Sequence, residues 1–340
     1  MSTTTAATLV RSEELVRRGN ARAAVELMTA ANRAAPDPAL EAALVQLRYD
    51  AWREVAAQPP LGPPAPPAVV PATPDGRMPE VAAADLDAGT VRAAIEARGG
   101  LIVRGLLSPE WCERLRDAID RSWAAIRRYQ QTGDLDPAWF HPIDTDAHGL
   151  TMAARQWGLQ GGTSFVPDSP RLLFDLLEAF EAAHVRTITR DYFGEPPALS
   201  LMKVAHRRLP PTAKGGWHQD AAVYGVTART LNFWVPVSRC GDVAPGLDLW
   251  PHRLDSIVQT TGTEGVAEFT ADPATVAAMM RDDPPVRPVF EAGDAVLFDQ
   301  WLLHQTAASP DYTERRYGFE CWLFAPSTYP DPQRFIPLAY

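Results

Sequence analysis

Three side chains of types that bind metals stand at two distant places in the sequence. His218 and Asp220 are two residues apart, and His304 follows much later, at the end of the apolar run 295–303. Two imidazoles and one carboxylate are the set that holds non-haem Fe(II) on one face and leaves the other face open for chemistry. A His-x-Asp triplet also occurs by chance, and a histidine that ends a strand is often a surface residue. The set therefore predicts an open iron site only if the fold brings the three side chains together.

The spacing of His218 and Asp220 suits an extended chain. Successive side chains of a strand point to opposite faces, so these two project together and Gln219 points elsewhere. The segment 295–304 predicts an apolar strand that follows a turn at 291–294 and ends in His304. A barrel places strands that are distant in sequence side by side, so the long separation is compatible with one site.

A cation beside the predicted site is expected from the segment 315–324. Alternation puts Arg315 on a face whose other side chains are apolar, whereas the opposite face carries Arg316 and Glu320. The apolar face suits a pocket wall, so the pattern predicts that Arg315 faces the metal after a turn-rich return through 305–314. A buried guanidinium needs an anion, and its planar fork matches a carboxylate. That carboxylate could belong to a ligand or to an Asp or Glu of the protein.

Helical patterns precede strand patterns in the larger part of the chain. Apolar spacing predicts helices at 90–98, 109–128 and 171–192, a short β run at 101–104, and strands at 200–204, 230–237, 295–303 and 315–324. Gly-, Pro- and Asp-rich turns separate these strands. Helices followed by many short strands predict an α+β domain with a sandwich or barrel of the jelly-roll kind.

Residues 1–57 are predicted to form a helical hairpin of their own. Apolar positions recur at helical spacing on both sides of Ala35-Pro36-Asp37-Pro38, which interrupts the helix and offers Asp37 as an N-cap. The unit is similar to one tetratricopeptide-like repeat, but such arrays need about three repeats to bury their faces. We therefore expect it to pack on the rest of the chain, on a second copy or on a protein partner. The Pro-rich stretch 58–80 is expected to be a semi-rigid spacer or an arm along the surface of a main domain, 81–340.

Composition excludes several classes of protein. The chain has 340 residues, 46% of them apolar, and a formal net charge of −10 with a pI near 5.2. This acidic balance argues against a nucleic-acid surface, which needs a concentrated basic patch. No apolar run approaches the roughly 18 residues of a membrane span, and the N-terminus lacks the basic and apolar regions of a secretory signal. The three cysteines form no CxxC pair, which favours a reducing compartment, and we expect a cytoplasmic protein.

Taken together, these motifs resemble the phytanoyl-CoA dioxygenase family of Fe(II)- and 2-oxoglutarate-dependent oxygenases. The resemblance covers about residues 91–324 and includes the segments 99–109, 217–220, 231–237 and Gly293-Asp294 ahead of the His304 strand. The order and spacing of the segments are more specific than any single one. The resemblance implies a double-stranded β-helix, that is, a jelly-roll or cupin-like barrel flanked by helices, with iron at its open end.

The resemblance also implies roles for single residues. His218, Asp220 and His304 match the iron ligands of the family. Arg315 matches the residue that binds the distal carboxylate of 2-oxoglutarate, and Thr306 stands where a hydroxyl could join that contact.

Two further positions match residues that line the cosubstrate site, Trp234 and Gln219, although strand alternation points Gln219 away from the ligands. The family's usual Pro-Gly-Ser-His segment is replaced by Trp250-Pro251-His252-Arg253, and we interpret His252 as a loop residue. The helical hairpin and the Pro-rich stretch lie outside the family's core. Because of these departures, the resemblance does not define the substrate.

The activity that the resemblance implies is hydroxylation of an unactivated C–H bond of a small molecule. Fe(II), 2-oxoglutarate and O2 would be the cofactors, and succinate and CO2 the coproducts. Asp220 fills the position that a halogenase of this class leaves vacant, which disfavours halogenation. Desaturation, cyclisation and epimerisation use the same ligands and stay open. Lys203, Arg207 and Arg208 would suit an anionic substrate, or would form a solvated loop.

Three other classes of protein are compatible with parts of the pattern. A cupin-like metalloenzyme would use the same ligands without 2-oxoglutarate. A zinc hydrolase would need a nearby general base, and none is evident. A catalytically inactive family member could act as an interaction protein that recruits a partner, or a second copy, through the helical hairpin.

Overall fold

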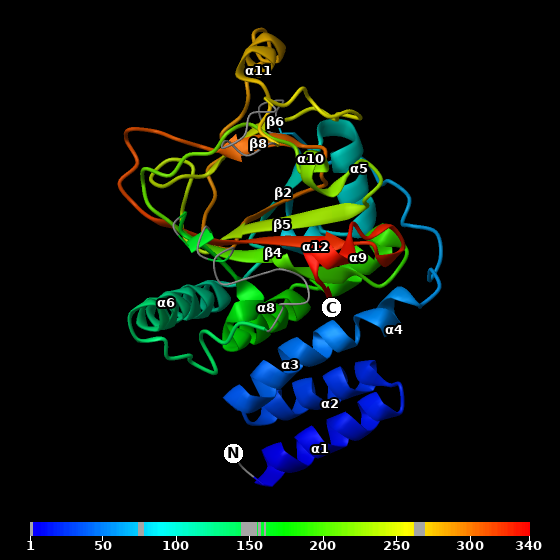
Figure 1. The fold of residues 1–340 in the computed structure, drawn as a ribbon. Helices are drawn as coiled ribbons and strands as arrows, with labels where there is room; N and C mark the ends of the chain where they lie inside the picture. The colour runs from blue at the N-terminus through cyan, green and yellow to red at the C-terminus, as the bar shows by residue number, and fades with distance from the viewer. Residues whose placement is uncertain (1–2, 74–77, 144–154, 156–157, 160, 262–268) are drawn as a thin grey trace.

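The fold is mixed α+β, with helices on one face of a large sheet and a second, small sheet on the other (Figure 1). The computed structural model describes residues 3–73, 78–143, 155, 158–159, 161–261 and 269–340. None of the helices in this described part combines the length and the apolar character needed to cross a membrane.

The large sheet is mainly antiparallel, and only its first two strands are parallel to each other. Its order is β1 (Glu80–Ala82), β2 (Gly100–Arg104), β7 (Ala295–Phe298), β5 (Thr230–Pro236), β9 (Arg316–Phe324), β4 (Ala198–Leu209) and β10 (Pro337–Ala339), with β3 (Thr163–Phe165) paired to β4. The small sheet contains β6 (Leu247–Trp250) and β8 (Leu303–Thr306). Single bridges, His218 to His304 and Leu249 to Val286, extend the small sheet at its two edges.

Both faces of the large sheet are buried. Side chains such as Phe233 and Phe319 pack against the helices in one apolar cluster. Side chains on the opposite face of the same strands, such as Trp234 and Trp322, pack in a second cluster that also contains Leu249 of the small sheet. The covering helices are α5 (Ala88–Arg98), α6 (Pro109–Thr132), α8 (Pro170–Ala182) and α9 (Val185–Phe193). Because both faces are buried, the burial pattern alone does not reveal which one faces the small sheet.

The predicted helices at 90–98 and 109–128 are confirmed as α5 and α6. Ser108 caps α6 by accepting a hydrogen bond from the Trp111 N–H, and Gly133 ends the helix at φ 79°. The single helix predicted at 171–192 is wrong, because α8 and α9 are separated at Ala183 and His184, with His184 in the left-handed region at φ 57°. Neither residue is a glycine or proline, so the sequence did not mark the break.

The strand predicted at 295–303 is also wrong as one element. β7 ends at Phe298 in the large sheet, and β8 begins at Leu303 in the small sheet. Between them the chain turns, and the Asp299 carboxylate accepts a hydrogen bond from the Trp301 N–H at 3.0 Å. A continuous apolar pattern hides this crossing because both strands are buried.

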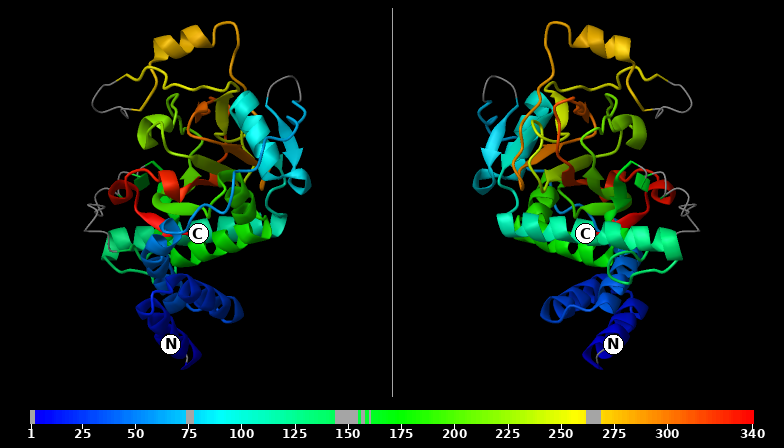
Figure 2. Two further views of the ribbon diagram at one scale, coloured as in Figure 1. Left: turned by 90° about the vertical axis from the view of Figure 1, so that its right-hand side faces the viewer. Right: turned by 90° about the vertical axis from the view of Figure 1, so that its left-hand side faces the viewer.

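The N-terminal segment folds as four helices: α1 (Thr3–Arg17), α2 (Ala21–Ala34), α3 (Pro38–Asp50) and α4 (Trp52–Ala56). The break between α2 and α3 lies at Ala35–Asp37, and Asp37 caps α3 by accepting a hydrogen bond from the Ala39 N–H. These helices lie at the opposite end of the molecule from α11 (Pro273–Met279), as both views of Figure 2 show. They pack on the rest of the chain, since α3 contacts α8 and β10.

The Pro-rich stretch lies along the surface of the main domain. The Leu61 and Ala65 N–H groups donate to the carbonyls of Gly194 and Asp191 near the end of α9. The Ala68 N–H donates to the Gly89 carbonyl in α5. Two short helices complete the fold, α10 (Ala221–Tyr224) and α12 (Pro332–Phe335).

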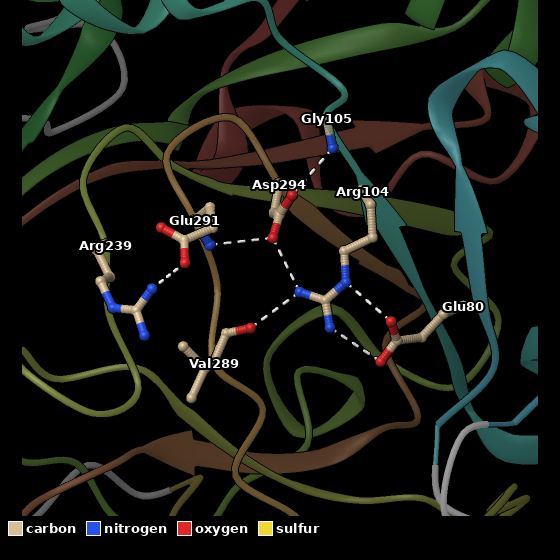
Figure 3. Close-up of polar contacts among 7 residues, drawn as sticks. All are labelled: Glu80, Arg104, Gly105, Arg239, Val289, Glu291 and Asp294. Atoms are coloured by element: carbon tan, nitrogen blue, oxygen red, sulfur yellow. Dashed lines mark hydrogen bonds and ion pairs between the residues drawn. The ribbon is translucent and has the colours of Figure 1, made fainter.

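A buried carboxylate joins the start of β7 to the end of β2 (Figure 3). Asp294 accepts hydrogen bonds from the Arg104 guanidinium at 2.8 Å, the Gly105 N–H at 2.9 Å and the Glu291 N–H at 3.0 Å. Arg104 also pairs with Glu80 at 2.8 Å. The network fixes the turn that leads into β7, and through β7 it fixes the direction from which the chain enters β8.

Asp294→Ala is expected to lower the free energy of unfolding by about 2–3 kcal/mol, because three N–H donors lose their acceptor and two of them are backbone groups. Urea unfolding followed by circular dichroism measures this loss. The matched control is Arg239→Ala, which breaks the exposed ion pairs with Asp242 and Glu291 at the same turn. The control should lose much less stability, and equal losses in the two variants would contradict the role given to Asp294.

Candidate metal centre

Two histidines face each other across neighbouring backbone segments. The His218 N–H donates to the His304 carbonyl at 2.9 Å, and the His304 N–H donates back to the His218 carbonyl at 3.1 Å. This reciprocal pairing is typical of directly opposed antiparallel residues, whose side chains point to the same face. The ring centroids lie 4.3 Å apart.

Both imidazoles are oriented by the backbone in the same way. Nδ1 of His218 lies 2.9 Å from the Gly216 carbonyl oxygen, and Nδ1 of His304 lies 3.0 Å from that of Leu302. A carbonyl oxygen only accepts, so each Nδ1 donates a proton to it, and in the neutral form of such a ring Nε2 carries the lone pair. Histidines that bind metals are held by such contacts at the second ring nitrogen.

Asp220 completes the group by a turn of the chain. It has helical backbone angles, φ −68° and ψ −14°, at the N-cap position of α10, so the chain bends after His218 and is not extended as expected. One Asp220 oxygen lies 3.7 Å from Nε2 of His304. The three predicted side chains therefore meet, with one possible ligand atom from each lying within 4.8 Å of the others.

The charge state of the group suits a divalent metal. Burial, reinforced by His218, lowers the pKa of His304 to about 3, so this imidazole is neutral at physiological pH. Burial raises the pKa of the Asp220 carboxyl, and the nearby His218 and Lys203 oppose that shift. Two imidazole nitrogens and one carboxylate in close proximity form a donor set that fits Fe(II).

The prediction that Arg315 faces the site is wrong. The Arg315 side chain is exposed, and β9 begins one residue later, at Arg316. Arg316 is only 2% exposed and donates to the carbonyls of Pro245 and Gly246 at 3.0 and 3.1 Å. The alternation rule assumed that the apolar face of the strand forms the pocket. That face packs against the helices, and the face with charged residues points to the small sheet.

Arg316 lies near Trp234 and Thr306, two residues that the sequence predicted to contact the cosubstrate. Its guanidinium carbon is 5.0 Å from the centroid of the buried Trp234 ring. The Gly246 carbonyl that accepts from Arg316 also accepts from the Ala307 N–H, the residue after Thr306. Burial lowers the pKa of Arg316 to about 10, and no carboxylate of the described chain forms an ion pair with it.

Gln219, the fourth residue assigned to the cosubstrate, does not join this group. Its side-chain amide donates to the carbonyls of Ser256 and Trp301 at 3.2 and 2.9 Å, and its oxygen accepts from the Val258 N–H at 2.8 Å. All of these partners are backbone groups. Gln219 therefore ties loops together on the side of the chain that faces away from His218 and Asp220.

A second set of charged side chains lies on the face of the large sheet that carries Trp234 and Arg316. Arg207 of β4 forms an ion pair with Glu320 of β9. Burial alone would raise the pKa of Glu320, but Arg207 and Lys203 together lower it to about 2. The ammonium of Lys203 lies 4.9 Å from the centroid of the Tyr224 ring and close enough to Asp220 to interact with its charge.

The sequence analysis did not identify Glu320 or Arg316 as site residues. The signal was present in the alternation along β9, because both residues lie on the charged face and the pattern favoured the apolar face as the pocket wall. Arg208, which the sequence offered as a contact for an anionic substrate, is on the other face of β4, where it pairs with Asp120 at 3.0 Å. It is therefore separated from Lys203 and Arg207.

Asn232 is another interior residue that the sequence did not mark. It is 1% exposed, and its side-chain oxygen has no hydrogen-bond partner among the described residues. It pairs with Trp322 of β9 and Phe298 of β7 in the large sheet. A buried amide oxygen without a partner is costly, so Asn232 has an acceptor available to a bound molecule.

Comparison with known proteins identifies one family. Residues 95–316 match the family model described as phytanoyl-CoA dioxygenase (PhyH). No curated protein sequence matches the chain.

Solved structures resemble the chain at low sequence identity. EctD from S. alaskensis, solved with 2-oxoglutarate and 5-hydroxyectoine, superimposes with a TM-score of 0.50 at 16% identity, covering 80% of this chain and 83% of its own. AviO1 from Streptomyces viridochromogenes Tue57 gives 0.46 at 19% identity over 73% and 99% of the two chains. EvdO2 from Micromonospora carbonacea var. aurantiaca gives 0.45 at 17% identity over 72% and 95%.

Proposed function

Since the chain belongs to the phytanoyl-CoA dioxygenase family of Fe(II)- and 2-oxoglutarate-dependent oxygenases, we propose that it hydroxylates an unactivated C–H bond of a small molecule. Succinate and CO2 would be the coproducts. The observation that carries the proposal is the close approach of His218, Asp220 and His304, with ligand atoms within 4.8 Å of one another.

We also propose that the two sheets form the double-stranded β-helix typical of such oxygenases. The bridges at His218 and Val286 extend the small sheet at both edges, and an apolar cluster fills the space between the sheets. Residues 81–340 would form this dioxygenase domain, with the helical unit 1–57 and the arm 58–80 attached to it.

His218, Asp220 and His304 would hold the iron. Three protein ligands leave coordination positions of an octahedral metal for 2-oxoglutarate and O2. When bound, the iron and its cosubstrate supply the oxidising power that breaks the C–H bond. The Nδ1 contacts to backbone carbonyls hold both imidazoles in a fixed orientation before the metal binds.

Arg316, and not Arg315, would bind the distal carboxylate of 2-oxoglutarate. A buried guanidinium without a carboxylate partner is unfavourable unless an anion joins it, and its two contacts to backbone carbonyls leave further N–H donors available. Thr306 ends β8 near the same carbonyls, so its hydroxyl would join this contact. Trp234 would form the floor beneath the guanidinium.

The substrate would be anionic, because one cation of the site wall forms no ion pair among the described residues. Arg207 is neutralised by Glu320, whereas no ion pair to Lys203 exists among the described residues. Burial lowers the pKa of Lys203, and Asp220 opposes that shift. A carboxylate or phosphate on the substrate would restore the balance and orient the molecule toward the iron.

Anaerobic addition of Fe(II) and 2-oxoglutarate is expected to produce the weak visible absorption band of the chelate, and O2 should then convert 2-oxoglutarate to succinate. His304→Ala should abolish both signals, because two ligands hold the metal poorly. The control is His252→Ala, since His252 pairs with Asp283 at 2.5 Å outside the three-residue group. A wild-type protein that binds iron without the band or succinate would overturn the proposed function.

Arg316→Gln is expected to raise the 2-oxoglutarate concentration for half-maximal succinate formation roughly a hundredfold, since a lost buried charge contact costs about 2–5 kcal/mol. Arg315→Gln, the neighbouring exposed arginine, should stay close to the wild type. Circular dichroism checks that both variants fold. A large effect in Arg315→Gln with none in Arg316→Gln would return the role to Arg315.

Lys203→Met is expected to remove a preference for anionic substrates. Succinate formation is measured with pairs of molecules that differ only in a free carboxylate or its amide, and the wild type should favour the acid. The preference should fall about tenfold in Lys203→Met, the size of one moderate charge contact. Arg208→Met, on the opposite face of the same strand, should keep it. An unchanged preference in Lys203→Met would refute the assignment.

A further inference from the structure

A second cavity lies far from the metal centre, where the N-terminal helices meet the main domain. Its volume is about 220 Å3, and it is lined by residues of α2, α3 and α4 on one side and of α9 and β10 on the other. Gln58 and Leu61 of the arm also contribute. Three segments that are distant in the sequence therefore line one partly open cavity.

The lining is strongly basic. It contains Arg22, Arg48, Arg186 and Arg190 but a single acidic residue, Glu26. The two exposed arginines have local partners, since Arg22 pairs with Glu26 at 3.4 Å and Arg190 with Asp191 at 2.8 Å. For Arg48 and Arg186, no ion pair exists within the described part of the chain.

Arg48 is the more buried of these two. Its side chain belongs to the last turn of α3 and is 7% exposed, and one nitrogen donates to the Ala339 carbonyl at 3.0 Å. Burial, together with the nearby Arg186 guanidinium, lowers the pKa of Arg48 to about 10. The carboxylate of Glu178 acts on Arg48 from a distance, but it is already bound by Arg33 at 2.6 and 2.8 Å.

Arg186 is also in an unfavourable place for a cation. It stands in the first turn of α9, where the helix dipole favours negative charge. Its guanidinium carbon lies 5.1 Å from the centroid of the Tyr340 ring, which also lines the cavity. The Tyr340 side chain is buried, and its hydroxyl has no hydrogen-bond partner among the described residues.

A purely structural role explains only part of this arrangement. One carbonyl uses one of the five N–H donors of Arg48, and it does nothing to offset the repulsion between Arg48 and Arg186. Two guanidinium groups that line one cavity without a carboxylate partner among the described residues favour a bound anion. Planar guanidinium forks match the oxygens of phosphate and carboxylate groups.

We propose that this cavity binds a small divalent oxyanion, a phosphate or dicarboxylate compound, between Arg48 and Arg186. The volume is below the usual range of about 300–1,000 Å3 for drug-sized ligands, so the ligand is a small metabolite or the charged end of a larger one. Because the cavity is shared by the helical unit, the arm and β10, a bound anion would fasten the N-terminal helices to the domain that carries the metal centre.

The test is calorimetric titration of the full chain with inorganic phosphate and, separately, with malonate, at constant ionic strength set with chloride. The titrations are done without Fe(II) or 2-oxoglutarate and are repeated in an Arg316→Gln background, so that anion binding at Arg316 does not contribute to the signal. The variants are Arg48→Gln and Arg186→Gln, and the second guards against misfolding because Arg186 is only half-buried. Arg53→Gln, an exposed arginine on α4 outside the cavity, is the matched control.

Saturable binding of phosphate or malonate is expected in the wild type and in Arg53→Gln, and the probe that binds identifies the class of anion. Arg48→Gln and Arg186→Gln should each weaken binding about tenfold or more, the effect of losing one charge-assisted contact. Absence of saturable binding of both probes would overturn the proposal, as would equal binding in all variants. Anion binding is measured without turnover, so its result does not depend on whether the proposed oxygenase activity is correct.

Discussion

The metal centre depends on one pair of reciprocal backbone hydrogen bonds, between His218 and His304. This pair places two imidazoles on the same face and brings a late strand beside a segment that precedes it by 86 residues. The Nδ1 contacts to the carbonyls of Gly216 and Leu302 then leave each Nε2 free. Asp220 joins only because the chain bends after the bridge. The three donors are thus positioned by local backbone structure before any metal is present, which keeps the entropy cost of assembling the site low.

The large sheet has two buried faces, and charged side chains lie on one of them. One face packs against α5, α6, α8 and α9 and is almost wholly apolar. The other face points to the small sheet, where aromatic side chains surround Arg316, Arg207 and Glu320. Charged groups are stable in such a place only when they are paired with an opposite charge of the protein or of a bound molecule. Arg207 and Glu320 are paired, whereas Arg316 and Lys203 have no ion pair within the described chain. The unpaired cations are therefore the best guide to where anionic molecules bind.

The sequence was informative about residue types and poor at choosing between two buried faces. The candidate metal-binding triplet was recognisable because His218, Asp220 and His304 are of the right kinds and lie in a family pattern. The same alternation rule selected Arg315 over Arg316 wrongly, since it assumes that a strand has only one buried side. The crossing between β7 and β8 was hidden by continuous apolar residues. The arginine cavity could not be predicted, because Arg48 and Arg186 meet only through tertiary packing of segments far apart in the chain.

The most direct test of the account is a crystal structure of the chain grown without oxygen in the presence of Fe(II) and 2-oxoglutarate. We expect the anomalous signal of iron between Nε2 of His218, Nε2 of His304 and the Asp220 carboxylate, with the distal carboxylate of 2-oxoglutarate on the Arg316 guanidinium. Iron held by other residues, or a cosubstrate whose distal carboxylate lies away from Arg316, would contradict the central claim that backbone pairing at His218 and His304 builds the catalytic centre.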